Sequence, residues 1–140
     1  MALTRGIAML SCAALLAFPA SAPAAPSGGS AAQIAWIRQS AGTFVAAELA
    51  GNGAGACARL TAAQRATEHG RTCARRWDAK LKKLLREPGG RAGLRKDAHA
   101  IGSATVLVHG NIASIDLPTP LLGGDASRLE WVENCWMLRS

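Results

Sequence analysis

The stretch ATVLVHGNIASIDL, residues 104–117, decides the fold class of this chain. Residues 104–108 and 112–117 are rich in β-branched side chains, and the dipeptide Gly110-Asn111 lies between them. Two such runs joined by a short turn sequence are typical of a β-hairpin. The pattern therefore predicts two antiparallel strands in the second half of the chain.

Residues 129–138, downstream of the hairpin, contain two tryptophans and a valine, which favour β structure. We expect them to form one further strand, after a loop that contains the sequence GGD. Side chains alternate between the two faces of a strand, so Cys135 is expected on the same side as Leu129, Trp131 and Met137.

Upstream of the hairpin, apolar side chains recur at helical spacing in three segments. Residues 34–50 predict a first helix, and residues 54–66 a shorter, alanine-rich second helix with Thr61 as a candidate cap. A third helix is expected between Thr72 and the helix-breaking residues 88–90. Its apolar stripe consists of Cys73, Trp77, Leu81, Leu84 and Leu85.

The order of these segments defines the fold class. The pattern changes from helical to strand-like after Gly93, so three helices precede about three strands. This order is typical of an α+β fold in which helices pack on one face of a curved antiparallel sheet. The chain has 140 residues, 49% of them hydrophobic and 18% charged, which indicates one folded domain and excludes a disordered protein.

The N-terminus has the three parts of a secretory signal peptide. Arg5 provides a positive charge, residues 6–20 are apolar, and residues 22–24 match the Ala-x-Ala cleavage pattern. The apolar run is shorter than the roughly 20 residues that a permanent membrane-spanning helix needs. We therefore expect residues 1–24 to be removed on export.

Cleavage after Ala24 leaves two further parts. Residues 25–32 are small or polar, which is typical of a flexible tether, and residues 33–140 are expected to form a single domain. The protein is then secreted or located in the periplasm or cell envelope, and the loss of Arg5 lowers its net charge from +7 to about +6. An uncleaved membrane anchor and a lipoprotein attached at Cys12 are the alternatives.

Four short segments of the mature chain resemble one family. They are FVAAELAGNG at 44–53, ACARLT at 56–61, CA at 73–74 and WVENCWML at 131–138. Together they resemble the exported NTF2-like proteins of high-GC bacteria, which are small cone-shaped α+β domains. The last strand of that family usually reads Asp-Gly-x-Trp, and here the sequence NCW at 134–136 stands in its place.

The resemblance implies a fold but leaves the activity open, because NTF2-like domains serve as isomerases, dehydratases, transport factors and non-catalytic binding modules. The isomerase-like members use a tyrosine and carboxyl groups inside the cone, and this chain contains no tyrosine. We therefore expect a non-catalytic binding module that needs no cofactor and binds a small apolar ligand or an envelope partner. A small pocket enzyme of the isomerase or lyase type and a basic surface-adhesion protein are the alternatives.

Three cysteines remain after export into an oxidising compartment, where cysteines tend to pair. Cys57 and Cys73 lie on neighbouring helical segments, and a disulfide between them would stabilise the domain by about 3 kcal/mol. Two buried thiols are the alternative. Cys135 is then expected to be free, either as a small core residue or as a reactive thiol that forms a homodimer. No C-x-x-C spacing indicates a metal site.

Four residues are candidates for a pocket. Glu48 falls within the apolar stripe of the first helix, where an unpaired carboxylate is costly to bury. His109 lies by the hairpin turn, Asp116 lies near the end of the second strand, and Cys135 is the fourth candidate. No spacing links them as a catalytic set, and a surface position at the end of an element is the alternative for the polar residues.

The densest positive charge lies between residues 71 and 96, which include ten Lys and Arg residues but only Asp78 and Glu87 as acids. The basic side chains opposite the apolar stripe of the third helix are Arg75, Arg76, Lys82, Lys83 and Arg86. Such a face favours an anionic envelope polymer or lipid surface, and a merely solvated face is the alternative. Nucleic acid is not expected as a partner, because no aromatic platform accompanies the charge.

Overall fold

The computed structural model describes residues 29–66, 69–117, 128–132 and 135–139. Within these residues, five helices are followed by four strands. The helices are α1 (Ala31–Leu49), α2 (Gly53–Cys57), α3 (Ala62–Arg65), α4 (Cys73–Leu84) and α5 (Gly90–Ala100), and the strands are β1 (Val106–His109), β2 (Ile112–Ile115), β3 (Arg128–Val132) and β4 (Cys135–Arg139). The predicted α+β class is confirmed, whereas the expected numbers of three helices and three strands were too low.

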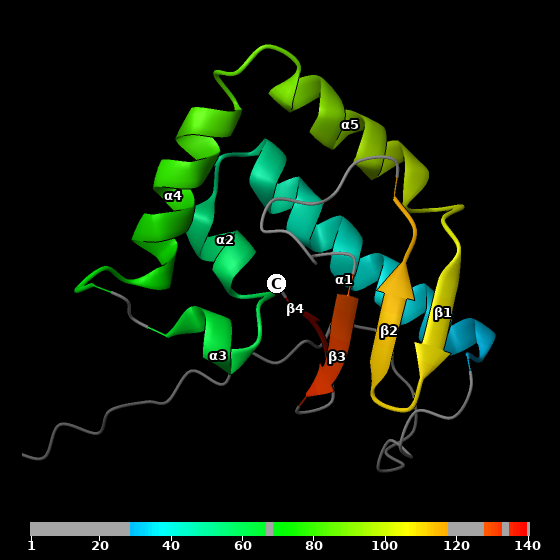
Figure 1. Cartoon of the computed structure of the whole chain (residues 1–140). Coiled ribbons are helices and arrows are strands. Elements are labelled where there is room, and N and C mark those ends of the chain that lie inside the picture. Colours follow the sequence, from blue (N-terminus) through cyan, green and yellow to red (C-terminus); the bar gives the residue numbers. More distant parts are fainter. Residues whose placement is uncertain (1–28, 67–68, 118–127, 133–134, 140) are drawn as a thin grey trace, which may run out of the picture.

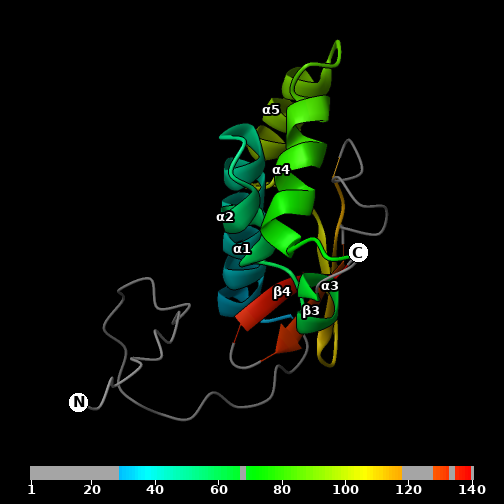
Figure 2. The ribbon, with the colours of Figure 1, turned by 90° about the vertical axis from the view of Figure 1, so that its left-hand side faces the viewer.

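The strands form one antiparallel sheet in the order β1-β2-β3-β4. The predicted hairpin is confirmed, since Val106 pairs with Ile115 and His109 with Ile112. Gly110 in its turn has φ +60°, a conformation that glycine adopts without strain. Figures 1 and 2 show α1 along one face of this sheet, with α2 and α4 on the flank opposite the β1–β2 hairpin and α5 across the end between them.

The predicted last strand, residues 129–138, is in fact two strands. Val132 pairs with Cys135 and Trp131 with Trp136, so the chain reverses within two residues. Trp131 and Trp136 therefore share a face, where their rings meet edge to face with centroids 5.4 Å apart. Cys135 lies on the opposite face from Trp131, contrary to the prediction, because the alternation of side chains starts again after a hairpin.

The first predicted helix is confirmed as α1. It starts two residues before the expected domain start at Gln33, because Ser30 and Gln33 form a capping box. The Gln33 N–H donates to the Ser30 hydroxyl at 3.2 Å, and the Ser30 N–H donates to the Gln33 side-chain oxygen at 3.0 Å. The predicted signal peptide and the first half of the predicted tether, residues 25–28, lie outside the described residues, whereas Ala31 and Ala32 belong to α1.

The predicted second helix, residues 54–66, is broken into α2 and α3. Leu60, between them, forms a parallel β-bridge with Leu138. The Leu138 N–H donates to the Arg59 carbonyl at 2.7 Å, and the Thr61 N–H donates to the Leu138 carbonyl at 3.1 Å. This backbone pairing covers the edge of β4, so a tertiary contact replaces the helical hydrogen bonds that the local sequence favours.

Helix α5 was not predicted. The sequence PGG at 88–90 ends α4 as expected, and Gly89 has φ +84°, but the chain then enters α5 instead of the expected strand-like segment. The helix buries Leu94 and Asp97, and the buried Ile101 follows at its C-cap. Residues 94, 97 and 101 have the spacing of one helix face. The sequence analysis did not recognise an amphipathic helix there, because residue 97 is an acid and was not expected to be buried.

The core joins the helical layer to the sheet. Its largest fully buried side chains include Ile37, Phe44, Leu60, Leu81, Ile115, Leu129, Trp136 and Leu138. The predicted disulfide between Cys57 and Cys73 is confirmed, and with Cα atoms 6.0 Å apart it joins α2 to the start of α4. In the part of the chain that the structure describes, no helix has the length and hydrophobicity needed to cross a bilayer.

Candidate functional site

Helix α4 buries one side in the core and exposes its basic side. Thr72 caps its N-terminus, where the Arg75 N–H donates to the threonine hydroxyl at 3.4 Å. Cys73, Trp77 and Leu81, each four residues apart, are buried. Since 3.6 residues complete a helical turn, this spacing directs the intervening basic residues toward solvent.

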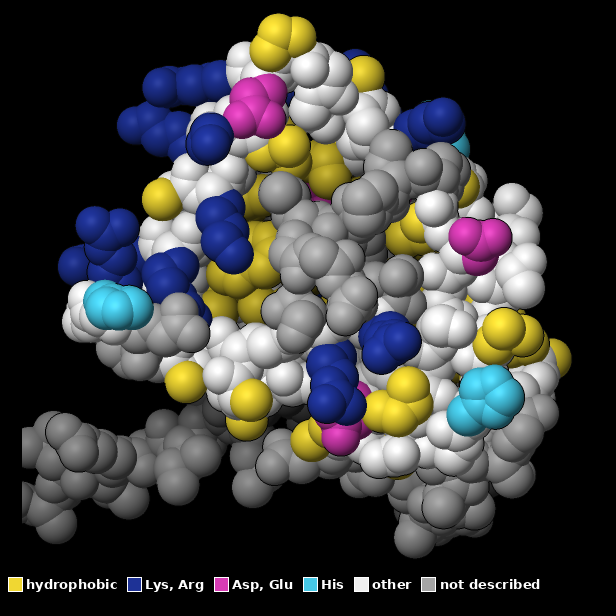
Figure 3. Space-filling view, viewed as in Figure 1, with side chains coloured by type: hydrophobic (Ala, Val, Ile, Leu, Met, Phe, Trp, Pro, Cys, Tyr) yellow, Lys and Arg dark blue, Asp and Glu magenta, His cyan; other side chains and the backbone are white. Residues whose placement is uncertain are grey.

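Four of the five predicted basic-face residues are exposed, and we define them as the basic face: Arg75, Lys82, Lys83 and Arg86. Arg76 is different, because its guanidinium donates to the carbonyls of Gln64 at 2.9 Å and Ala66 at 2.8 Å. It is half-buried and attaches α4 to the end of α3, so it contributes less to the surface than predicted. Figure 3 shows Lys and Arg side chains gathered over the flank that α4 forms.

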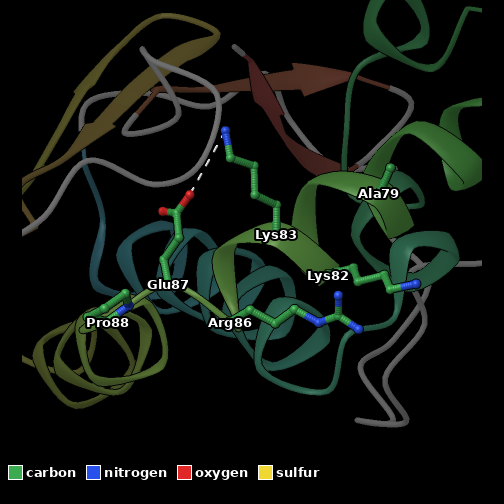
Figure 4. A pocket seen from close by; sticks show the side chains of 6 residues that line it. All are labelled: Ala79, Lys82, Lys83, Arg86, Glu87 and Pro88. Atoms are coloured by element: carbon green, nitrogen blue, oxygen red, sulfur yellow. Dashed lines mark ion pairs between the residues drawn. The ribbon is translucent and has the colours of Figure 1, made fainter.

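A shallow hollow of about 500 Å³ opens at the C-terminal end of the basic face. Its lining residues are Ala79, Lys82, Lys83, Arg86, Glu87 and Pro88. Lys83 lies 4.0 Å from the carboxylate of Glu87, and both side chains are largely exposed. Figure 4 shows Lys82 and Arg86 extending alongside each other on the other side of α4 from this ion pair. The acid of the hollow is therefore directed toward Lys83 rather than toward Lys82 and Arg86.

Lys82 lies in the last turn of α4 and Arg86 in the turn that follows it, so two exposed positive charges lie close together and repel each other. A bound anion would remove this repulsion. The planar guanidinium of Arg86 can donate two parallel hydrogen bonds to a phosphate, and the ammonium of Lys82 adds a mobile point charge. The arrangement is therefore suited to a phosphate or carboxylate group.

Glu48, one of the predicted pocket residues, is fully buried in the last turn of α1. Among the residues that the structure describes, neither of its carboxyl oxygens has a hydrogen-bond partner. Burial raises its pKa from 4.5 to about 8, and the negative charge of Asp97 on α5 adds to the rise. Glu48 therefore keeps its proton at neutral pH.

Asp97 was missed by the sequence analysis, although it is only 1% exposed. It lies three residues after Leu94 and four before Ile101, and both of these are buried. This i, i+3, i+7 spacing is the signal that could have identified it, had α5 been predicted as a helix.

The structure does not bring Glu48 together with the other two polar pocket candidates. His109 and Asp116 are both exposed, at opposite ends of the β1–β2 hairpin. The backbone N–H of Asp116 donates to the Thr105 carbonyl at 2.9 Å, which continues the ladder beyond β2. A buried acid on α1 and two exposed residues on the hairpin do not form one catalytic set.

Cys135 is half-buried on β4 and is disulfide-bonded. The prediction that Cys135 is free was therefore wrong for the whole chain. It rested on three cysteines after removal of Cys12 with the leader, whereas the 140-residue chain has four, an even number that allows complete pairing.

Over the described ranges, no three His, Cys, Asp or Glu side chains gather in a way that would hold a metal ion. Comparison with known proteins supplies no family: no protein-family model matches this chain, and no curated protein or solved structure matches it either. The geometry of α4 is therefore the basis for assigning a function.

Proposed function

We propose that this protein is an exported binding module that attaches to the anionic lipid surface of the cell envelope through the basic face of α4. The observation that carries the proposal is the adjacent pair Lys82 and Arg86, exposed beside a shallow hollow whose acid, Glu87, is paired with Lys83. Lipid headgroups present phosphate at a broad surface, which suits an open hollow better than it suits an enclosed pocket.

The magnitude fits a peripheral membrane contact. A basic residue near an anionic bilayer contributes roughly 1 kcal/mol, so the four residues of the basic face provide on the order of 4 kcal/mol. That corresponds to a dissociation constant near 1 mM for this face alone. Attachment is therefore expected to be reversible and sensitive to salt.

Two further features support the other parts of the proposal. The Cys57–Cys73 disulfide is compatible with an extracellular protein, since such bonds persist in oxidising compartments. The polar pocket candidates Glu48, His109 and Asp116 do not converge, which favours a binding module over a pocket enzyme. An NTF2-like cone and a small apolar ligand inside it remain predictions.

Co-sedimentation with lipid vesicles tests the proposal. We expect the protein to bind vesicles containing phosphatidylglycerol but not pure phosphatidylcholine vesicles. Binding should disappear in about 1 M salt, where the screening length falls from about 8 Å to 3 Å. The double variant K82E/R86E should bind roughly 30-fold more weakly, because reversing two charges removes at least about 2 kcal/mol.

The matched control is the double variant R95E/K96E, which makes the same change in net charge at two exposed positions on α5. It should retain most of the binding. Equal binding to both kinds of vesicle would contradict the proposal, and so would an equal loss in both double variants. Binding to soluble polyphosphate without binding to vesicles would replace the lipid with an anionic polymer.

A further inference from the structure

Helix α5 has little apolar surface with which to hold its place on α1. Leu94 and Asp97 are its buried residues, and Ile101 at the C-cap adds one more. Gly89, at its N-cap, makes no side-chain cap hydrogen bond. On the surface, the Arg91 guanidinium donates to the Leu49 carbonyl at 3.3 Å. One of the few buried contacts that dock α5 is therefore a carboxyl group.

That carboxyl group, Asp97, acts on Glu48, so two acids are buried at one helix–helix interface. Burying one ionised carboxylate is costly, and burying two that repel each other costs more. Among the described residues no hydrogen bond reaches the Glu48 oxygens to offset that cost. Ionisation of Glu48 therefore destabilises the interface.

The other ionisable groups on the elements packed around α1 are engaged or exposed. Arg91 donates to the carbonyl of Leu49, the residue after Glu48, and Arg38 on α1 donates to the Ala104 carbonyl at 2.8 Å. Asp78 on α4 accepts from the Gly53 N–H at 2.8 Å, and Arg139 on β4 lies 3.9 Å from Glu130. The exposed ones on α5 are Arg95, Lys96 and His99. Helix α2 contributes only Cys57, which is in a disulfide and does not titrate. Burial is therefore the main cause of the raised pKa of Glu48, and the charge of Asp97 adds to it.

We infer that the buried, unpartnered carboxyl group of Glu48, with the buried Asp97 nearby, is a proton-dependent latch: α5 stays docked on α1 while Glu48 holds its proton, and α5 opens as that proton passes to water or a buffer base. This latch is independent of the basic face on α4. It would let an envelope protein loosen one helix as the external pH rises, without loosening the disulfide-linked α4.

Linkage sets the size of the effect. The docked state holds the Glu48 proton with a pKa of about 8, whereas a solvated glutamate has a pKa of 4.5. Between these values each rise of one pH unit makes opening about tenfold more favourable, and above about pH 8 the effect levels off.

Amide hydrogen exchange on the intact protein tests this inference, with rates corrected for the intrinsic effect of pH. The protection of α5 amides should fall about tenfold per unit from pH 5.5 to 7.5 and should stay below that of the α4 amides, which are exposed only by further unfolding. The variant Glu48→Gln cannot ionise and should abolish the slope in α5. The control Glu87→Gln, at an exposed position after α4, should retain it.

Equal protection of α4 and α5 amides at every pH would replace local release with global unfolding and overturn the inference. A slope that persists in Glu48→Gln would also overturn it. A carbon-13 NMR titration of the wild-type Glu48 carboxyl provides a measurement that needs no variant. An inflection near pH 8 is expected, and one below pH 6 would remove the latch.

Discussion

Helices α4 and α5 are consecutive and of similar length, 12 and 11 residues, but different forces hold them in place. Helix α4 buries Trp77, whose ring meets Phe44 edge to face with centroids 5.3 Å apart, and the disulfide ties it to α2. Helix α5 buries Leu94 and the titratable Asp97. The difference teaches that one helix is held by contacts insensitive to pH, and the other by a contact that depends on a proton.

The largest expected effect concerns α5 and the pH dependence of global stability. The folded state holds the Glu48 proton more tightly than the unfolded chain, with a pKa of about 8 instead of 4.5. Its contribution to the free energy of unfolding is therefore full below pH 4.5 and is lost progressively up to pH 8. The loss is about 4–5 kcal/mol relative to Glu48→Gln.

Urea denaturation of the wild type and Glu48→Gln at several pH values between 4.5 and 8.5 measures this loss. The difference between the two proteins isolates Glu48, because the substitution changes no other ionisable side chain. If the free energies of unfolding of the wild type and Glu48→Gln changed in parallel with pH, Glu48 would not make the protein sensitive to pH. The contrast between α5 and α4 would then be wrong.

The next effect concerns the covalent link of α4. Replacing Cys57 and Cys73 by alanine opens a loop with a sequence separation of 16 and should destabilise the domain by about 3 kcal/mol. The loss should be the same at pH 5 and pH 7.5, because disulfide-bonded cysteines do not titrate. Denaturation at both values checks this, and an unchanged midpoint would mean that the helical layer does not need the link.

The smallest expected effects concern two glycines: Gly53 of α2, which packs against α4, and Gly93 of α5. A Cβ on Gly53 would lie within 2.6 Å of the Asp78 backbone nitrogen on α4, so Gly53→Ala should cost about 1–3 kcal/mol. A Cβ on Gly93 of α5 meets no atom within 4 Å, so Gly93→Ala should stabilise by about 0.5–1 kcal/mol. Thermal melting of both variants measures these changes. The same sign for both would show that α4 and α5 are packed equally closely.

Local patterns in the sequence were sufficient for several elements and for part of the candidate site. The apolar spacing of residues 34–50 predicted α1, and the two β-branched runs around Gly110 predicted the hairpin. The neighbouring positions of Cys57 and Cys73 predicted the disulfide. The exposed side of α4 followed from its buried stripe. In each case the prediction depends on residues that are close together in the sequence, where the periodicity of a helix or strand shows which side chains share a face.

Residues that depend on distant partners could not be predicted in the same way. Leu60 leaves the helical pattern because Leu138, far along the chain, offers it a β-bridge. The spacing of Arg76 along α4 predicts an exposed side chain, yet its guanidinium donates hydrogen bonds to backbone carbonyls at the end of α3. The sequence between β3 and β4 contains no glycine, so one strand was expected instead of two.

By itself, the sequence determined the α+β class, α1, α4, the β1–β2 hairpin, the disulfide and the basic side of α4. Only the tertiary structure decided that Glu48 faces Asp97, 49 residues later in the chain, across the interface of α1 and α5. The physical reason is that periodicity shows which side of an element is buried but not which element covers it. The pKa of a buried acid depends on that covering element, through its desolvation and its charge.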